Sequence, residues 1–238
     1  MTAHAPSLRL EIVSDTICPW CYIGKRRLGR ALDQLAAEGL GFELLWRPFQ
    51  LNPTMPMEGV DRRSYRTGKF GSWERSQALD AQVAAAGAED GLVFRHDLMA
   101  RTPNTVASHA LIHLAHELGG AELQDRLVEA LFAAYFTQGC DVGDPAVLAD
   151  LAEAAGMDRA RVTTYLADPA SGAAVRQDEE LARRLDLHGV PSIVLEGHHL
   201  FSGALPTPSI VQALREASVV LGRHRAGTVA AEADHHAA

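Results

Sequence analysis

Two cysteines near the N-terminus, Cys18 and Cys21, stand one helical turn apart and enclose Pro19 and Trp20. A pair at this spacing can carry out thiol–disulfide exchange, in which one thiolate attacks a disulfide and a second thiol resolves the mixed disulfide. It can also supply half of a structural zinc site, which needs four ligands. No second such pair and no suitably spaced histidine pair follows, so redox chemistry is favoured over a metal site and over inert thiols.

The residues around this pair predict a strand before it and a helix after it. Residues 8–13 alternate apolar and polar side chains, and from Pro19 onward apolar side chains recur near a 3.6-residue period. A cysteine at a helix start lies beside unpaired backbone N–H groups and the positive end of the helix dipole, which lower its pKa. Cys18 is therefore predicted to be the nucleophile and Cys21 the shielded resolving thiol.

The rest of the chain predicts an α/β domain interrupted by helices. A strand is expected over residues 41–46, a helix over 174–187, a hairpin over 190–195 and 199–202, and a last helix over 207–221. Between them, alanine-rich segments broken by glycine and proline fit about six helices, the clearest over 106–118, 123–136 and 146–155. We predict a discontinuous domain of residues 8–51 and 174–222, an inserted helical domain over 52–173, and a disordered tail over 223–238.

Pro191 lies where a predicted helix gives way to a predicted strand. Proline is restricted within a sheet to edges and first residues, so this position fits either an ordinary trans proline or a cis Val190–Pro191 bond. A cis bond would turn the Val190 backbone outward beside the cysteine pair. An extended peptide could then pair with it as an added strand.

Composition narrows the class of protein. The 238 residues carry a formal net charge of -8 without a Lys/Arg cluster, which argues against nucleic acid or an anionic membrane as partner. The first ten residues lack the pattern of a secretion signal, and no apolar stretch is long enough to span a bilayer. Three cysteines are too few for a secreted disulfide scaffold. We expect a soluble, cytoplasmic protein with no metal and no tightly bound cofactor, as a monomer or homodimer.

These stretches together resemble the DsbA-like thioredoxin superfamily, specifically its cytosolic FrnE-type branch, which is related to 2-hydroxychromene-2-carboxylate isomerases. The resemblance covers about residues 8–221 and is carried by residues 15–25, 103–105, 135–139, 189–192 and 201–204. It implies a thioredoxin-like fold with a large inserted all-helical domain, Cys18 as nucleophile, Cys21 as resolver and Pro191 as a cis-proline facing them. One departure is Ser192, where an aromatic or aliphatic residue is expected, so the floor of the substrate groove is expected to differ.

The function predicted is thiol–disulfide exchange between the Cys18–Cys21 pair and protein or low-molecular-weight thiol substrates, with glutathione as a candidate redox partner. The expected substrate contacts are Pro19, Trp20, Val190 and Pro191. One alternative is a glutathione-dependent isomerase or transferase on the same fold, but such enzymes typically carry serine in place of the first cysteine. The other is a non-catalytic, chaperone-like binding module, whose function would survive Cys18→Ser.

Other side chains with possible chemistry have plainer interpretations. Asp15 could tune Cys18 or relay protons, although an acidic residue at a strand end is more often a capping or solvated group. Cys140 is expected to be a free thiol without a role. Histidines occur in three groups that lack further ligands, and we expect no metal at any of them. These groups are His109, His113 and His116; His198 and His199; and His235 and His236.

Overall fold

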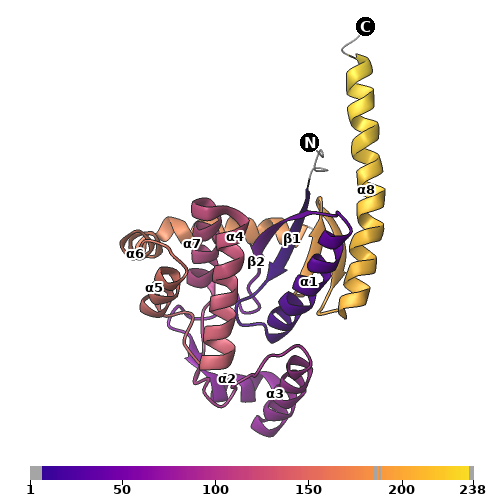
Figure 1. Ribbon diagram of the computed structural model, residues 1–238. Helices are drawn as coiled ribbons and strands as arrows, with labels where there is room; N and C mark the ends of the chain where they lie inside the picture. Colours follow the sequence, from indigo (N-terminus) through magenta and orange to yellow (C-terminus); the bar gives the residue numbers. More distant parts are fainter. Residues whose placement is uncertain (1–6, 185–186, 188, 236–238) are drawn as a thin grey trace.

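A four-stranded mixed sheet joins the two ends of the chain (Figure 1). The computed structural model describes residues 7–184, 187 and 189–235. The strands are β1 (Leu8–Ser14), β2 (Phe42–Pro48), β5 (Ser192–Leu195) and β6 (His198–Ser202), in the order β2-β1-β5-β6. β1 runs parallel to β2 and antiparallel to β5, which forms a hairpin with β6. The predicted strand-helix-strand unit and the predicted hairpin therefore share one sheet.

Helices flank this sheet. α1 (Pro19–Ala37) packs against α8 (Thr207–His235), while α4 (Val106–Gln138) and α7 (Pro169–Arg184) pack against each other and against β2. The remaining helices are α2 (Arg62–Phe70), α3 (Trp73–Ala88), α5 (Pro145–Ala154) and α6 (Arg159–Ala167). In Figure 1, α2 and α3 lie below the sheet, and α5 and α6 lie beyond α4 on the side away from α1. In the part of the chain that the structure describes, every helix is too short or too polar to cross a bilayer.

The long helix α4 contains the break that the glycine pair predicts. Gly119 (φ -147°, ψ 18°) and Gly120 (φ 64°, ψ -156°) both leave the helical region, so two helical halves meet at a kink. The positive φ of Gly120 falls where a side chain would be strained. The expected helices over 106–118 and 123–136 are therefore both present, without a loop between them.

The structure differs from the prediction in three larger respects. The insertion is not wholly helical, because β3 (Val60–Asp61) and β4 (Arg101–Thr102) form a small antiparallel sheet. Strands this short carry no readable alternation. α7 starts at Pro169 rather than 174, because the Asp168 carboxylate caps it by accepting from the Ala170 N–H at 2.8 Å. α8 continues to His235, against the tail predicted from residue 223, since this alanine-rich stretch contains no proline; residues 236–238 lie outside the described part.

One hydrophobic core runs through the sheet domain and the insertion. It includes Leu10 and Ile12 of β1 together with Phe132 and Phe136 of α4, all fully or almost fully buried. Tyr22 of α1 stacks on Phe132 with ring centroids 5.2 Å apart. The two parts of the chain are thus packed as one body.

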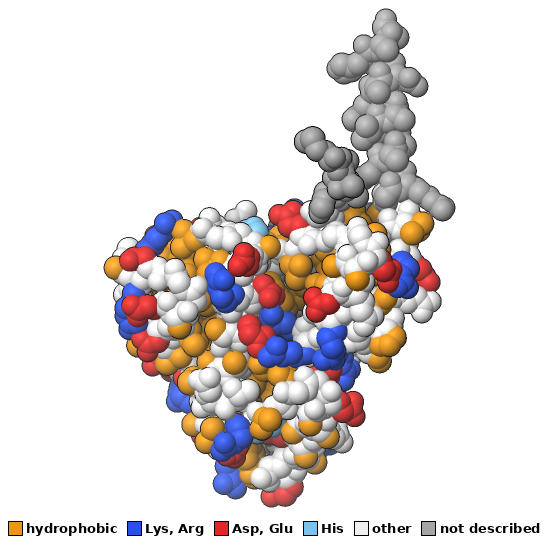
Figure 2. Space-filling view, in the orientation of Figure 1, with side chains coloured by type: hydrophobic (Ala, Val, Ile, Leu, Met, Phe, Trp, Pro, Cys, Tyr) orange, Lys and Arg blue, Asp and Glu red, His pale blue; other side chains and the backbone are white. Residues whose placement is uncertain are grey.

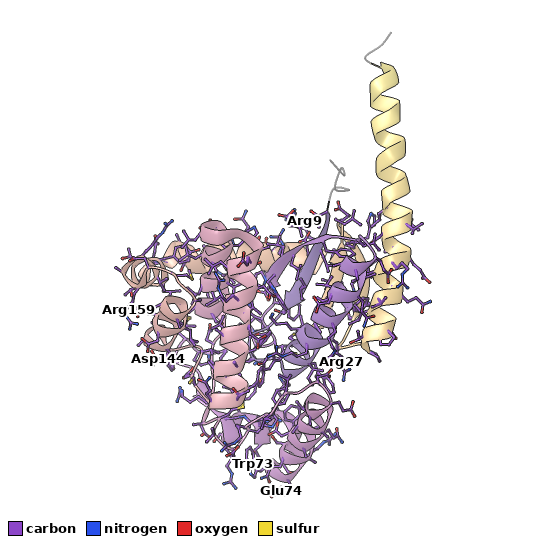
Figure 3. All side chains as sticks on the ribbon, in the orientation of Figure 1. Arg9, Arg27, Trp73, Glu74, Asp144 and Arg159 are labelled. Carbon is purple, nitrogen blue, oxygen red and sulfur yellow. The ribbon has the colours of Figure 1, made fainter. Side chains whose placement is uncertain are left out.

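Polar contacts tie the same two parts together. The Gln124 side chain of α4 bonds to the edge strand β2, accepting from the Trp46 N–H at 2.9 Å and donating to its carbonyl at 3.1 Å. This pairing covers part of an otherwise open sheet edge. Arg27 of α1, labelled in Figure 3, donates to Asp90 of the insertion and to the Ala204 carbonyl, both at 2.7 Å. On the face shown in Figure 2, acidic and basic side chains are interspersed.

Two glycines of α1 test how closely this helix packs. A Cβ at Gly24 would lie 3.0 Å from Pro191 Cγ, whereas a Cβ at Gly29 would meet nothing within 4 Å. We expect Gly29→Ala to raise the free energy of unfolding by about 0.5–1 kcal/mol, because alanine favours the helix. Gly24→Ala should instead lower it by roughly 1 kcal/mol through overpacking. Urea denaturation followed by circular dichroism measures both; equal stabilisation by the two variants would contradict the tight contact.

Candidate active site

Cys18 lies at the N-cap of α1, directly after the loop that leaves β1. Its backbone is extended (φ -91°, ψ 111°), its N–H donates to the Asp15 carbonyl and its own carbonyl accepts from the Cys21 N–H, both at 3.0 Å. Pro19 fills the first helical turn, where an N–H is not needed. Both cysteines are free thiols, 4% and 1% exposed respectively. The fold therefore places two buried thiols at the start of a helix.

The loop before β5 brings a distant part of the chain to Cys18. The Cys18 Sγ donates to the Val190 carbonyl at 3.7 Å, and the Val190–Pro191 peptide bond is cis. Ser192 follows as a fully buried residue whose hydroxyl donates to the Gly189 carbonyl at 2.7 Å. The serine that departs from the family pattern thus stabilises this loop from within.

Cys21 is the more protected of the two thiols. Burial raises its pKa well above the ordinary value, and the neighbouring Cys18 raises it further through a hydrogen bond and its charge. The Asp15 backbone N–H lowers the pKa of Cys21, while the Asp15 carboxylate raises it. Near neutral pH, Cys21 is therefore a protonated thiol that must lose its proton before it can attack.

A pocket of about 440 Å³ opens beside Cys18 and is called the Cys18 pocket below. Pro19, Trp20 and Val190 line it next to the cysteine, and Trp20 is 40% exposed. The insertion supplies most of the opposite wall, with polar side chains from Arg62, Tyr65, Arg66, Lys69, Asp80, His96 and Tyr135. A larger hollow of about 570 Å³ between α1 and β2 is lined by neither cysteine. The Cys18 pocket is therefore the space in which a substrate could reach the thiol.

Cations outnumber carboxylates in the wall of the Cys18 pocket. Arg62 and Arg66 share Asp80, at 2.8 and 2.6 Å. The Lys69 ammonium donates to the Tyr65 hydroxyl at 2.9 Å and has no carboxylate partner among the residues described. Overall composition reveals no basic cluster. The missed signal was the spacing of Arg62, Arg66 and Lys69, which places them on one face of α2. The pocket wall favours an anionic ligand.

Asp15 is more deeply buried than a capping residue would be. It has no exposed surface, and its carboxylate accepts from the Leu51 N–H at 2.8 Å. Its Oδ1 lies 3.5 Å from Nε2 of His109 on α4. The two residues are 94 positions apart along the chain, so no local pattern in the sequence pairs them.

The other singled-out residues lie away from the Cys18 pocket. Cys140 follows α4, and its Sγ is 3.9 Å from Gln138 Oε1. His198 and His199 are exposed on β6, and His236 lies outside the described residues. Within the described ranges, no group of three or more His, Cys, Asp or Glu side chains is arranged to hold a metal ion.

The family model of the DSBA-like thioredoxin domain matches residues 9–215. The chain belongs to the DsbA-like thioredoxin family. Among solved structures, a probable DsbA oxidoreductase, SCO1869 of Streptomyces coelicolor, is 36% identical over 88% of this chain and 89% of that one, with a TM-score of 0.79. The predicted DsbA-like fold is confirmed.

Two more distant structures share the fold of this DsbA-like chain. A 2-hydroxychromene-2-carboxylate isomerase is 14% identical, covers 92% of this chain and 98% of its own, and has a TM-score of 0.64. The cytosolic disulfide reductase DsbM of Pseudomonas aeruginosa, solved with GSH, is 19% identical, covers 92% and 100%, and has a TM-score of 0.59. Oxidoreductases and an isomerase thus occur on this architecture.

His96 lies in the wall of the Cys18 pocket, and its pKa is lowered. Burial lowers its pKa, Arg62 and Arg66 lower it further, and Asp80 opposes them. We expect His96 to titrate below about 6.5 in a histidine NMR titration. Arg66→Gln should raise this pKa by removing a cation, whereas Arg161→Gln on the distant α6 should not.

The same shift has a consequence for stability. Because the pKa of His96 is lower in the folded chain, the unfolded chain binds the extra proton first, and stability falls as the pH drops below about 6.5. A His96→Gln variant should lose that part of the pH dependence in urea denaturation. A His96 pKa above its ordinary value would contradict both expectations.

Proposed function

We propose that this DsbA-like protein is a thiol–disulfide oxidoreductase whose working group is the Cys18–Cys21 pair. The observation that carries the proposal is the position of Cys18, a free thiol at a helix N-cap that lines a pocket and faces the Val190 carbonyl. Unpaired backbone N–H groups at a helix start favour a negatively charged group there. Such a position suits the attacking sulfur of disulfide exchange.

Exchange requires two balanced steps. The Cys18 thiolate attacks one sulfur of a substrate disulfide, forming a mixed disulfide and releasing the first substrate thiolate, which takes up a proton. The Cys21 sulfur, once deprotonated, then attacks Cys18, forming the Cys18–Cys21 disulfide and releasing the second substrate thiolate. The pair loses two electrons and the substrate disulfide gains them; the reverse sequence oxidises a dithiol.

For the substrate, we favour a compound that carries carboxylates. The cations Arg62, Arg66 and Lys69 outnumber Asp80 in the wall of the Cys18 pocket. Glutathione is such a compound, and the structural neighbour DsbM was solved with it. In this proposal, Trp20 and the 190–191 backbone contact the part of the substrate next to its sulfur, with Pro19 and Pro191 shaping the site. Protein disulfides with acidic flanks would be bound by the same groups.

The finer assignments belong to the same proposal. A cytoplasmic location and the FrnE-type branch accord with the description of DsbM as cytosolic and with the reduced state of thiols in that compartment. The glutathione-dependent isomerase alternative is less favoured, because Cys18 stands where such enzymes typically carry serine. A purely chaperone-like role is less favoured, because it gives no function to the two buried thiols at the start of α1.

Single cysteine variants test the oxidoreductase assignment. Cys18→Ser should reduce disulfide exchange to background in an assay with glutathione disulfide, because the attacking sulfur is gone. Cys21→Ser should still form the first mixed disulfide and accumulate it, as detected by intact-protein mass spectrometry. Cys140→Ser is the matched control and should retain full activity; an active Cys18→Ser protein would reject the assignment.

A charge variant tests the substrate preference. Lys69→Gln removes a cation without a carboxylate partner in the described structure, so we expect KM for glutathione disulfide to rise roughly fivefold, about 1 kcal/mol. KM for the neutral hydroxyethyl disulfide should stay unchanged. Arg161→Gln, an exposed position on α6, controls for the change in net charge. Equal effects on both substrates would contradict a role in recognising carboxylates.

A further inference from the structure

The strand β2 forms one edge of the four-stranded sheet, so it pairs with another strand on one side only. The Leu8 N–H donates to the Gly41 carbonyl at 3.2 Å, which shows that the odd-numbered residues of this segment direct their backbone groups toward β1. These directions alternate along a strand. The backbone N–H and C=O groups of Phe42, Leu44 and Trp46 therefore point outward, away from the sheet.

The outward edge of β2 is covered at Trp46. The side-chain amide of Gln124 accepts from the Trp46 N–H at 2.9 Å and donates to the Trp46 carbonyl at 3.1 Å. It thus takes the place that a peptide group of a further strand would take. In the described part of the chain, no residue pairs with the outward backbone groups of Phe42 and Leu44. Unpaired edge groups of this kind are a template for pairing with another chain.

A hollow of about 570 Å³ lies along this open edge and is called the β2 groove below. Figure 1 shows β2 between α1 and α4, and both helices contribute to the lining of the groove. A Cβ at Gly29 of α1, one of the lining residues, would meet nothing within 4 Å. The apolar lining residues are Leu28, Leu32, Phe42, Leu44, Trp46 and Ala121. Unpaired strand groups therefore lie beside an apolar surface with open space next to it.

Carboxylates outnumber cations around the β2 groove. Its charged lining residues are Lys25, Asp33, Glu43, Glu122 and Asp125. Lys25 is already paired, because it donates to Asp125 at 2.8 Å. Asp33 and Glu43 are exposed and have no cationic partner among the described residues. The groove therefore favours a ligand that carries positive charge.

We propose that the β2 groove binds an extended segment of a partner protein in which apolar and basic residues alternate, and that this segment adds to the sheet beside β2. Its backbone pairs with Phe42 and Leu44, next to the position that Gln124 covers. Its apolar side chains pack on the apolar lining, and its basic side chains lie near Asp33 and Glu43. In this mode of recognition, backbone pairing supplies affinity and the side-chain contacts supply specificity. The β2 groove and the Cys18 pocket share no lining residue, so this binding does not depend on the cysteine pair.

A fluorescent synthetic peptide in which lysine and valine alternate over about seven residues serves as the probe. Fluorescence anisotropy measures its binding to the full-length protein. Gly29→Leu fills the β2 groove and should weaken binding about tenfold or more. Gly68→Leu is the matched control, because a Cβ at this helical glycine of α2 would likewise meet nothing within 4 Å. Glu43→Gln should weaken binding roughly threefold, whereas Glu180→Gln, at an exposed position of α7, should not.

Amide hydrogen exchange distinguishes strand addition from simple attraction to a chain of net charge -8. Exchange of the Phe42 and Leu44 N–H groups should slow when the peptide binds. The same peptide methylated at every backbone nitrogen cannot donate hydrogen bonds and should neither bind nor protect these groups. Equal binding of the methylated peptide, or binding that leaves both N–H groups unprotected, would overturn the proposal.

Two other occupants of the β2 groove are separated by the same measurement. Protection of Phe42 and Leu44 in the free protein that disappears when residues 1–6 are deleted would assign the groove to the chain's own N-terminus. Protection that disappears on dilution would assign it to a second copy of the chain. Either result would reject the partner segment. Cys18→Ser should bind the peptide as the native protein does, so this test and the test of the proposed function can fail separately.

Discussion

The close contact between α1 and the loop before β5 is the constraint on which the candidate site depends. Gly24 carries no side chain there, and Pro191 Cγ lies 3.0 Å from the place a Cβ would occupy. The sheet also holds these regions together, because Val13 of β1, the strand before α1, pairs with Ser192 of β5, the strand after the loop. Between these two contacts the Cys18 sulfur faces the Val190 carbonyl at 3.7 Å. Residues more than 170 positions apart are thus held together by one helix and one strand pair.

The insertion completes the site from two directions. α2 brings cations to the Cys18 pocket, and the first half of α4 places His109 Nε2 3.5 Å from the carboxylate of Asp15, which lies in the loop before Cys18. Aromatic packing fixes this arrangement, since Tyr22 of α1 lies 5.2 Å from Phe132 and 6.0 Å from Phe136 in ring-centroid distance. The inserted segment therefore supplies the charged wall of the Cys18 pocket and also contacts the loop that precedes Cys18.

Local patterns explain how much the sequence could predict. The alternation in β1, the proline at the start of α1 and the glycines that break α4 each act through neighbouring residues, so they predicted elements and the place of Cys18. The resemblance to the DsbA-like family predicted that Pro191 would face the cysteine pair. The pairing of Asp15 with His109 depends on how α4 packs beside the loop after β1, for which no local signal exists. The spacing of the cations on α2 could predict that they share one helix face. That this face lines the Cys18 pocket could be known only from the structure.

The shared core also limits how this architecture can be divided. Gln124 completes hydrogen bonds at the edge of β2, and Phe132 covers Tyr22, so the sheet domain lacks an independent surface beneath α4. Removal of the insertion would expose aromatic side chains, backbone N–H and C=O groups of β2 and the cysteine pair to solvent. The inserted segment is thus not a removable accessory. A minimal redox domain derived from this chain must retain α4 or replace the surface it covers.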